Sequence, residues 1–554
     1  MGFDKGLLLV FLISIIPLFN LLTPGLLVSH DAWLHGGRLA SFYQSLSEGI
    51  LIPRWAGNLN LGFGHPILMF VYPLPSYIGS ILHFIGFTYT DAVKIMLGGS
   101  YILSGVFMYL WVKEFLGKHA GIVAAVLYLY APYRFIDLYV RGALGEHMAF
   151  IFLPLIMYAL LKLSGIKVNS NINSYYLPFF FVAISFMLLI LTHNAVSLIF
   201  IPFIIFYSLF LFIEDKSKIK LFLTFLSLGY GVLLSFFFWF PAFMEGKYTL
   251  RDIITAGEYS KHFVNPTSLI YGPWSFGGSG IFTVQIGIVH IALVLASIIL
   301  FKKLFRKSKN EKIVYFGTLG FLLVSIFLML KESNFIWQIF TTLPKIQFPW
   351  RFLTMIVFST SIIGALFVSK FNHKLLIIFI SVATIIPTYS YWHAKEYDAS
   401  FTDNYFEKVF KETTDTGEVS PIWSIRFMEE EPKDDIEIID GDAKLIKIEK
   451  KSNYHEYVIN VNKRTRIREN TLYFPGWKVY DNEIEITDIE FQDPKNRGLI
   501  TFYVDPGLHN IILKFEDTKL RRFANYVSAV SLIGLVFIPI LIVNGIRKRL
   551  KIKK

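Results

Sequence analysis

Long apolar stretches alternate with short polar ones over the first 391 residues, and one more follows near the C-terminus. A run of about 20 apolar residues is long enough to cross a bilayer as a helix. The candidate spans are 7–27, 66–87, 91–116, 119–132, 147–165, 175–192, 195–213, 219–243, 284–304, 312–331, 351–370, 373–391 and 523–545. This pattern predicts a polytopic α-helical membrane protein with about 12 or 13 spans, in which the short run 119–132 re-enters the bilayer or packs at an angle.

The segment 28–65 lies between the first two candidate spans and contains no run long enough to cross a membrane. Its apolar residues Leu39, Phe42, Tyr43 and Leu46 recur at helical spacing. An amphipathic helix with such a face lies along the membrane interface. The first outer loop is therefore expected to contain interfacial helices.

The pattern changes at residue 392, which closes a predicted transmembrane domain over 1–391. Beyond it charged residues become frequent and the long apolar runs stop. Apolar positions now alternate, as at Tyr457, Ile459 and Val461, which is typical of half-buried strands. The region 392–522 is predicted to be a small antiparallel β-sandwich.

Two turn signals, Pro475-Gly476 and Asp505-Pro506-Gly507, separate the predicted strands of this domain. The second follows the apolar run 499–504 directly, so it is expected to turn the chain between two strands. The remaining region, 523–554, is predicted to be a last transmembrane helix with a basic tail.

The net charge of +12 is concentrated in particular short loops and in the tail. In a chain that is 54% hydrophobic, this charge indicates the positive-inside bias of a membrane protein rather than binding to nucleic acid. We therefore expect a multi-pass protein of the cell membrane, with a cytoplasmic tail and an extracytoplasmic β-rich domain. The chain contains no cysteine, which excludes disulfides, thiolate nucleophiles and cysteine-bound metals.

With this sidedness, unusual polar and aromatic residues gather at the outer ends of different spans. The candidates are Asp31, His35, Arg54, His65, Arg141, Glu146, His147, His193, Trp350 and Arg351. A carboxylate can deprotonate an incoming hydroxyl, and arginines can hold phosphate oxygens and stabilise a departing phosphate. Asp31 and Glu146 are accordingly the candidate catalytic acids, and the other eight are candidate substrate-binding residues.

Asp31 at the outer end of the first span, followed by interfacial helices, resembles the GT-C superfamily of membrane glycosyltransferases. The stretch from Gly121 to Arg134, with Arg141-Gly142-Ala143-Leu144-Gly145-Glu146, resembles the second acidic region of these enzymes. The resemblance implies a GT-C architecture, Asp31 as catalytic acid, and a sugar donor linked to a polyprenyl carrier on the outer face.

More closely, the chain resembles the YfhO-like bacterial membrane proteins and the neighbouring family named after 6-pyruvoyl-tetrahydropterin synthase. Four segments carry this likeness: Pro53-Arg54-Trp55, Arg141 to Glu146, Phe348-Pro349-Trp350-Arg351-Phe352, and Tyr473-Phe474-Pro475-Gly476-Trp477. The pterin-synthase chemistry in that family name fits poorly, because it requires a tight zinc-binding histidine cluster and these histidines are scattered over separate spans.

The chain departs from the GT-C pattern in two places. It has no Asp-Glu pair in the first outer loop and no Asp-x-Asp in the second. Metal-independent transfer from a polyprenyl-monophosphate sugar is therefore favoured over metal-dependent oligosaccharyl transfer. The residues indicate no cofactor or metal site, and they leave open whether a divalent cation takes part.

The leading hypothesis is an integral-membrane glycosyltransferase. It would move a sugar from a polyprenyl-phosphate donor in the lipid bilayer to a glycan, lipid or protein acceptor at the cell surface. A flippase or transporter of lipid-linked sugar is the first alternative, although it would place ionisable residues near the midplane. A non-catalytic glycan-binding scaffold is the second, and for it Asp31 would be a solvated helix-end charge and Arg351 a snorkelling one.

Overall fold

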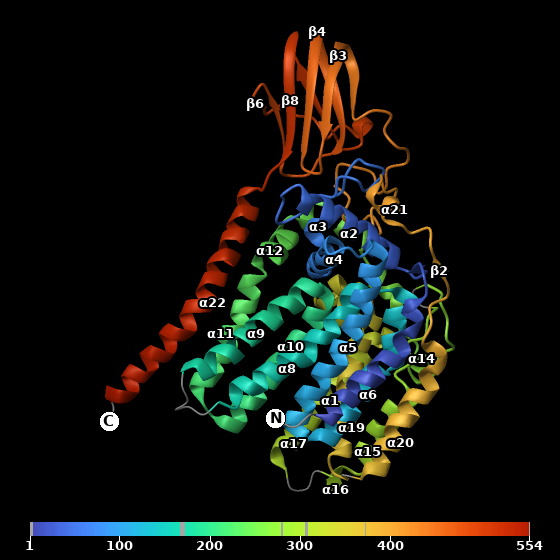
Figure 1. The fold of residues 1–554 in the computed structure, drawn as a ribbon, viewed down its shortest axis with the longest axis vertical. Helices are drawn as coiled ribbons and strands as arrows, with labels where there is room; N and C mark the ends of the chain where they lie inside the picture. Colours follow the sequence, from blue (N-terminus) through green and yellow to red (C-terminus); the bar gives the residue numbers. More distant parts are fainter. Residues whose placement is uncertain (1–3, 167–171, 279–280, 305–307, 372, 553–554) are drawn as a thin grey trace.

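The computed structural model describes residues 4–166, 172–278, 281–304, 308–371 and 373–552. Helices form one long body, and an antiparallel sheet stands at one end of it (Figure 1). The long helices are α1 (Lys5–Ile15), α5 (Tyr89–Leu116), α6 (Lys118–Leu129), α8 (Leu144–Ser164), α9 (Ile172–Thr192), α10 (Asn194–Asp215), α11 (Lys218–Leu234), α12 (Phe236–Met244), α15 (Ile288–Ile299), α17 (Lys309–Met329), α19 (Leu353–Val368), α20 (Lys374–Ile385) and α22 (Lys519–Ile552).

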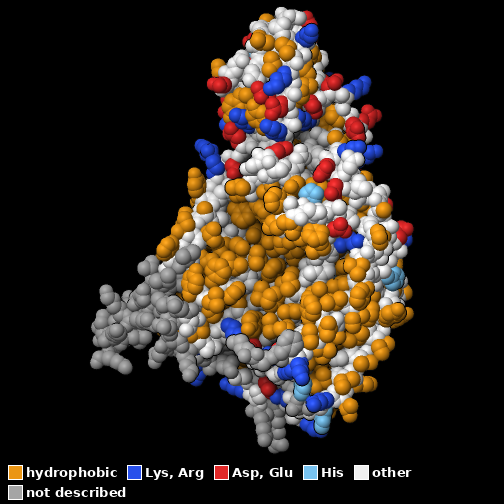
Figure 2. Space-filling model, viewed as in Figure 1, with side chains coloured by type: hydrophobic (Ala, Val, Ile, Leu, Met, Phe, Trp, Pro, Cys, Tyr) orange, Lys and Arg blue, Asp and Glu red, His pale blue; other side chains and the backbone are white. Residues whose placement is uncertain are grey.

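Within the described residues, eight helices are long and apolar enough to cross a membrane, and ten if each of two bent pairs is one span. One bent pair joins 118–129 to 132–141 at 51°, and the other joins 218–234 to 236–244 at 64°. Hydrophobic side chains cover the flank of the helical body, while charges gather on the sheet and at the opposite end (Figure 2). The predicted polytopic α-helical membrane fold with a C-terminal antiparallel sheet is confirmed.

Two predicted spans are wrong. The run 66–87 contains two short helices, α3 (Ile67–Phe70) and α4 (Leu74–Phe84). Pro73, which lies between them, and Pro75, in the first turn of α4, lack the N–H groups that a helix continuing from α3 would need. The run 284–304 contains α15, which has only 12 residues and starts after Gly287 at φ +107°. In both cases hydrophobicity alone overstated the length of the helix.

The segment 133–146, which joins the predicted spans 119–132 and 147–165, is mostly helical. After α6 the chain bends and continues as α7 (Pro132–Phe135) and the π-helical turn η2 (Ile136–Arg141), and it leaves the helix at Gly142. The predicted amphipathic helix in the first outer loop is confirmed as α2 (Ala32–Ser47), which buries Leu39 and Phe42. These two elements position most of the candidate site.

The sheet consists of β3 (Ile436–Lys450), β4 (Tyr454–Leu472), β5 (Trp477–Asp481), β6 (Ile484–Ile486), β7 (Leu499–Val504) and β8 (Gly507–Phe515), in the order β3-β4-β8-β5-β6. Strand β7 pairs with the second half of β4, and β8 pairs with its first half. The two strands are therefore consecutive along β4, and the predicted turn at Asp505-Pro506-Gly507 does not reverse the chain. Proline interrupts the ladder there because it lacks an N–H.

The sheet starts at Ile436, although the sequence placed the β-rich domain from 392 onward. Residues 394–428, which we call the strap, instead lie across the segment 28–65. Its Phe410 N–H donates to the Asn58 carbonyl at 2.8 Å, and the Asn60 N–H donates to the Glu412 carbonyl at 3.0 Å. The ring of Phe406 packs against Gly36 so closely that a Cβ there would lie 2.4 Å from it. The strap thus fixes α2 from the side of the sheet.

A buried ion pair joins the sheet domain and α22 to the helical body. The Arg521 side chain is fully buried, and its Nε donates to Glu245 Oε2 at 2.8 Å. Arg521 Nη2 also donates to the Pro475 carbonyl at 2.5 Å, and the Thr518 hydroxyl donates to Glu245 Oε1 at 2.9 Å. One guanidinium group therefore links α12, the turn before β5 and the start of α22.

Replacing Arg521 with Met should destabilise the protein by about 3–5 kcal/mol, because it leaves the Glu245 carboxylate buried and unpaired. Thermal unfolding of the full chain in detergent measures this loss. Arg497→Met is the matched control, since Arg497 forms an exposed pair with Glu429 at 2.9 Å in the sheet domain and should cost at most about 1 kcal/mol. Equal losses in the two variants would contradict the role of Arg521.

Candidate active site

Asp31 sits at the start of α2, pressed against the end of the π-helical turn. Its backbone N–H donates to the Arg141 carbonyl at 2.8 Å, and the His30 N–H donates to the Val140 carbonyl at 3.1 Å. The approach depends on Gly142, which has φ +61° and where a Cβ would lie 2.4 Å from the Ser29 Oγ. The Asp31 side chain is half-buried and has no hydrogen bond or ion pair among the described residues. Its carboxylate is therefore available to a substrate.

Arg141 is the centre of a buried charge cluster. Its Nη1 donates to Glu146 Oε2 at 2.9 Å, to Asp137 Oδ1 at 2.5 Å and to the Tyr133 hydroxyl at 3.3 Å. The Tyr133 hydroxyl in turn donates to Glu146 Oε1 at 2.5 Å. Both carboxylates are fully buried. Nε and Nη2 of Arg141 have no hydrogen bond to any described residue, so this edge of the guanidinium can receive another acceptor.

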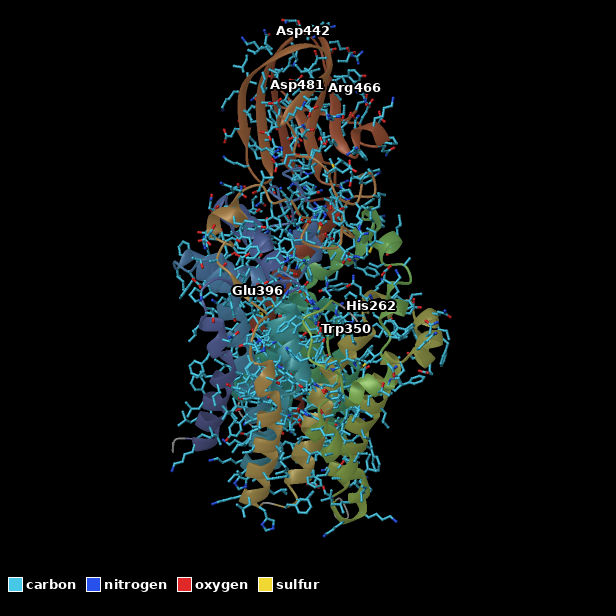
Figure 3. All side chains as sticks on the ribbon, turned by 90° about the vertical axis from the view of Figure 1, so that its right-hand side faces the viewer. His262, Trp350, Glu396, Asp442, Arg466 and Asp481 are labelled. Carbon is cyan, nitrogen blue, oxygen red and sulfur yellow. The ribbon has the colours of Figure 1, made fainter. Side chains whose placement is uncertain are left out.

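Arg351 and Trp350 join this cluster from the turn before α19. Arg351 Nε lies 3.5 Å from Glu146 Oε2, so one carboxylate oxygen faces both arginines. The Arg141 guanidinium lies 4.4 Å from the centroid of the Trp350 ring, which stacks on Phe348 at 4.9 Å. Figure 3 shows Trp350 near His262 inside the helical body, away from Asp442, Asp481 and Arg466 of the sheet. Cation–π contact adds to the ion pairs in holding Arg141 in place.

His193 lies between α9 and α10 and caps the second helix. Its Nδ1 accepts a hydrogen bond from the Val196 N–H at 3.2 Å. Burial, and then the nearby Arg351, lower the pKa of His193, so the ring is neutral near pH 7. Because Nδ1 is the acceptor, the single proton is on Nε2. The ring packs against Tyr72 at 5.1 Å between centroids and presents a neutral donor.

A small, open hollow lies next to these groups, between α2, α4 and α5. Its polar lining comes from His35, Arg38, Tyr72 and Ser76, and its apolar lining includes Met96. Burial, and then Arg38, lower the pKa of His35, which is therefore neutral. Arg38 forms no ion pair with a carboxylate among the described residues. A ligand with one charged end and one apolar end matches this lining.

Three predicted site residues lie elsewhere. Arg54 pairs with Asp517 at 3.1 Å and donates to the Asn525 side chain at 2.8 Å, so it belongs to the joint with the sheet domain. His65 is fully buried, with Nε2 3.3 Å from the Ser420 Oγ of the strap. His147 stacks on Tyr101 of α5 at 6.0 Å. The structure does not bring these three to the Arg141 cluster.

Sequence reasoning missed several residues of the site, above all Asp137 and Tyr133. Their signal was helical spacing, because Asp137 lies four residues before Arg141 and Tyr133 four residues earlier still. This spacing has meaning only if residues 132–141 are helical, and the sequence analysis treats them as the connection between two spans. Tyr72 and Arg38 carried no comparable signal, since only the packing of α2 against α4 places them in one hollow.

One family model matches more than half of the chain. Residues 68–394 match the model of the 6-pyruvoyl-tetrahydropterin synthase related domain, described as a membrane protein. The chain belongs to this family. The matched residues include Glu146, His193 and Arg351, whereas Asp31 and His35 precede them. The family expected from the sequence is confirmed, and so is a multi-pass membrane protein.

The family name refers to a pterin synthase, whose zinc site is a cluster of histidines. In the described part of the chain, no group of three or more His, Cys, Asp or Glu side chains is placed to hold a metal ion. The residues therefore do not fit that site, and no chemical step below involves a metal.

An uncharacterised protein of Lactococcus lactis is 24% identical over 277 residues, which are 48% of this chain and 44% of that protein. Among solved structures, the chain is similar to the mycobacterial arabinofuranosyltransferase AftD, with TM-score 0.47, 13% identity, and coverage of 71% of this chain and 27% of AftD. It is also similar to the oligosaccharyltransferase of Archaeoglobus fulgidus, solved with zinc and sulfate, with TM-score 0.41, 14% identity, and coverage of 73% and 57%.

A third solved structure is ArnT of Cupriavidus metallidurans bound to undecaprenyl phosphate, with TM-score 0.37 and 11% identity over 73% of this chain and 68% of ArnT. The chain thus spans less than half of the curated relative and about a quarter of AftD.

Gly142→Ala should separate Asp31 from Arg141, because the added methyl group meets Ser29 and the φ of +61° is unfavourable for alanine. We expect a stability loss of about 1–3 kcal/mol in thermal unfolding. Gly99→Ala in α5 is the control, since a Cβ there meets nothing within 4 Å and alanine favours the helix. If Gly142→Ala unfolds like the control, the close contact is wrong.

His193→Ala should cost about 0.5–2 kcal/mol, because the N-cap acceptor of α10 is removed. His193→Asn should keep most of this stability, since asparagine is a good N-cap acceptor. Thermal unfolding of both variants separates the capping role from any role of the imidazole. An asparagine variant as unstable as the alanine variant would argue against the cap.

Proposed function

We propose that this protein is an integral-membrane glycosyltransferase. It transfers a sugar from a polyprenyl-phosphate donor to a hydroxyl of a glycan, lipid or protein acceptor. One observation carries the proposal: the Asp31 backbone N–H donates to the Arg141 carbonyl, which places the half-exposed Asp31 carboxylate near the Arg141 cluster and the amphipathic hollow. A base next to guanidinium groups is what the displacement of a sugar from phosphate requires.

In this proposal Asp31 accepts the proton of the acceptor hydroxyl as its oxygen bonds to the anomeric carbon. The bond between that carbon and the phosphate oxygen breaks, and its electron pair leaves with the polyprenyl phosphate. The phosphate thereby gains one negative charge while Asp31 loses one. The total charge of the site is unchanged, which suits a water-poor setting where net charge is costly.

Arg38, Arg141 and Arg351 are the proposed phosphate-binding groups. Arg141 offers the free Nε and Nη2 edge, and Arg38 lines the hollow without a carboxylate partner among the described residues. His35 and the Nε2–H of His193 add neutral donors, and Trp350 holds Arg141. The apolar lining of the hollow, which includes Leu39 and Met96, is proposed to face the start of the polyprenyl chain.

Glu146 was a candidate catalytic acid, and its contacts favour a different role. Oε1 accepts from Tyr133, and Oε2 faces both Arg141 and Arg351. A carboxylate engaged in this way orients two guanidinium groups rather than exchanging a proton with substrate. We therefore assign the proton transfer to Asp31 and the positioning of the arginines to Glu146.

The proposal includes a sidedness. The sheet end of the molecule lies outside the cell membrane, and the basic loops at the opposite end lie in the cytoplasm, as the positive-inside rule indicates. The acceptor then reaches the site from the cell surface. Lipidomic and glycan analysis of a deletion strain identifies the donor that accumulates and the product that is missing.

Asp31→Asn should reduce transfer by about 10²–10⁴-fold with unchanged insertion and thermal stability, because the general base is lost. The assay measures consumption of the accumulated donor and formation of product by purified protein in proteoliposomes. Asp505→Asn, an exposed aspartate in the sheet domain, is the control and should transfer normally.

Full transfer by Asp31→Asn would rule out the assigned base. A protein that moves fluorescent lipid-linked sugar across the bilayer and never cleaves the phosphosugar bond would instead be a transporter. Binding of glycan without either activity would identify a scaffold.

A further inference from the structure

Gln347, in the turn before Arg351, has an unusual backbone conformation. Its φ is +66°, in the left-handed region that residues other than glycine rarely adopt. Such a conformation persists only where the surrounding structure holds it, and it is often found at functional sites. The contacts of Gln347 show what holds it here.

The side chain of Gln347 connects a carboxylate of the strap to an arginine of the site. Its Nε2 donates to Glu418, at 3.1 Å from Oε1 and 3.2 Å from Oε2. Its Oε1 accepts from Arg351 Nη1 at 3.3 Å, and Arg351 Nε faces Glu146 at 3.5 Å. A continuous polar chain therefore runs from Glu418 through Gln347 and Arg351 to Glu146.

Glu418 is itself held in place. Its Oε2 accepts from the Thr416 hydroxyl at 2.7 Å, and Arg251 contributes a nearby positive charge. The Asp415 carboxylate accepts from the Gly417 N–H at 3.1 Å and the Val419 N–H at 2.9 Å, which fixes the turn that presents Glu418. A fixed donor–acceptor geometry can orient the next group in the chain.

The same stretch of the strap reaches a second arginine. Arg38 donates to both the hydroxyl and the carbonyl oxygen of Thr414, whose φ is also +66°. Two of the three proposed phosphate-binding arginines, Arg38 and Arg351, are thus hydrogen-bonded to residues with positive φ: Thr414 in the strap, and Gln347, which is bonded to the strap. Two such strained residues in contact with arginines indicate that the surrounding structure holds this part of the strap in place.

We propose that Glu418 and Gln347 are positioning residues that set the orientation of Arg351 toward Glu146 and the substrate phosphate. The inference rests on the proposed function for its chemical consequence, and on the contacts above for the positioning itself. The strap is then part of the site, although Glu418 lies 67 residues after Arg351 in the chain.

A charge-swap cycle tests this proposal in the full-length protein. Gln347→Glu places a carboxylate opposite Glu418, and Glu418→Gln removes the charged acceptor of the Gln347 amide. Combining both substitutions restores one donor opposite one acceptor and keeps an acceptor for Arg351. Gln44→Glu is the control, because Gln44 donates to Glu48 at 3.3 Å in a similar but exposed pair away from the site.

Two measurements are made on each variant. Hydrogen–deuterium exchange follows peptides that cover residues 343–353, and steady-state transfer gives kcat and KM. We expect each single variant to exchange about tenfold faster there and to lose about tenfold in kcat with little change in KM. The double variant should recover to within about threefold of the unmodified protein, and the control should match it.

The positioning proposal is overturned if exchange over 343–353 is unchanged in the single variants, or if the double variant is no better than the worse single one. If the unmodified protein transfers no sugar from any donor, the proposed function fails, and the exchange measurements still decide whether Glu418 and Gln347 position Arg351.

Discussion

The structure of the site depends on one buried guanidinium group. Arg141 balances two fully buried carboxylates, Asp137 and Glu146, through a single nitrogen. Buried charges are tolerated only when they are paired and hydrogen-bonded, so displacing Arg141 would leave Asp137 without its ion-pair partner and Glu146 with only Arg351 and Tyr133. This constraint holds the bent helix 132–141 in place, and the Arg141 carbonyl accepts the hydrogen bond that attaches the segment 28–65.

Segments from the whole length of the chain converge on that group. The first loop supplies Asp31, and the turn before α19 supplies Trp350 and Arg351. The strap holds α2 and the Arg351 turn, while the Arg521–Glu245 pair attaches the sheet domain to the same end of the helical body. The sheet domain is therefore built into the end of the molecule that contains the site.

The charges of the site fit a reaction in which charge moves without accumulating. Arg141 pairs with Asp137 and Glu146, Arg351 also faces Glu146, and Arg38 and Asp31 form no ion pair among the described residues. Of these three carboxylates, Asp31 alone is half-exposed, and its side chain makes no hydrogen bond or ion pair with the described residues. The family match reaches from 68 to 394, so it includes the buried part of this set and leaves the accessible carboxylate to the preceding segment.

The sequence alone determined the features that depend on neighbouring residues. Apolar runs identified the membrane helices, alternation identified the sheet, and the acid at the start of α2 was visible as a charge at the end of a span. Tertiary structure decided the rest. The helical path of 132–141 brings Asp137 to Arg141. Arg54 pairs with Asp517, and His65 contacts Ser420, so neither joins the site. Glu418 is connected to Arg351 through Gln347. Local pattern records which residues one helix or strand buries, whereas partners distant in the chain are chosen by packing and by the need to pair every buried charge.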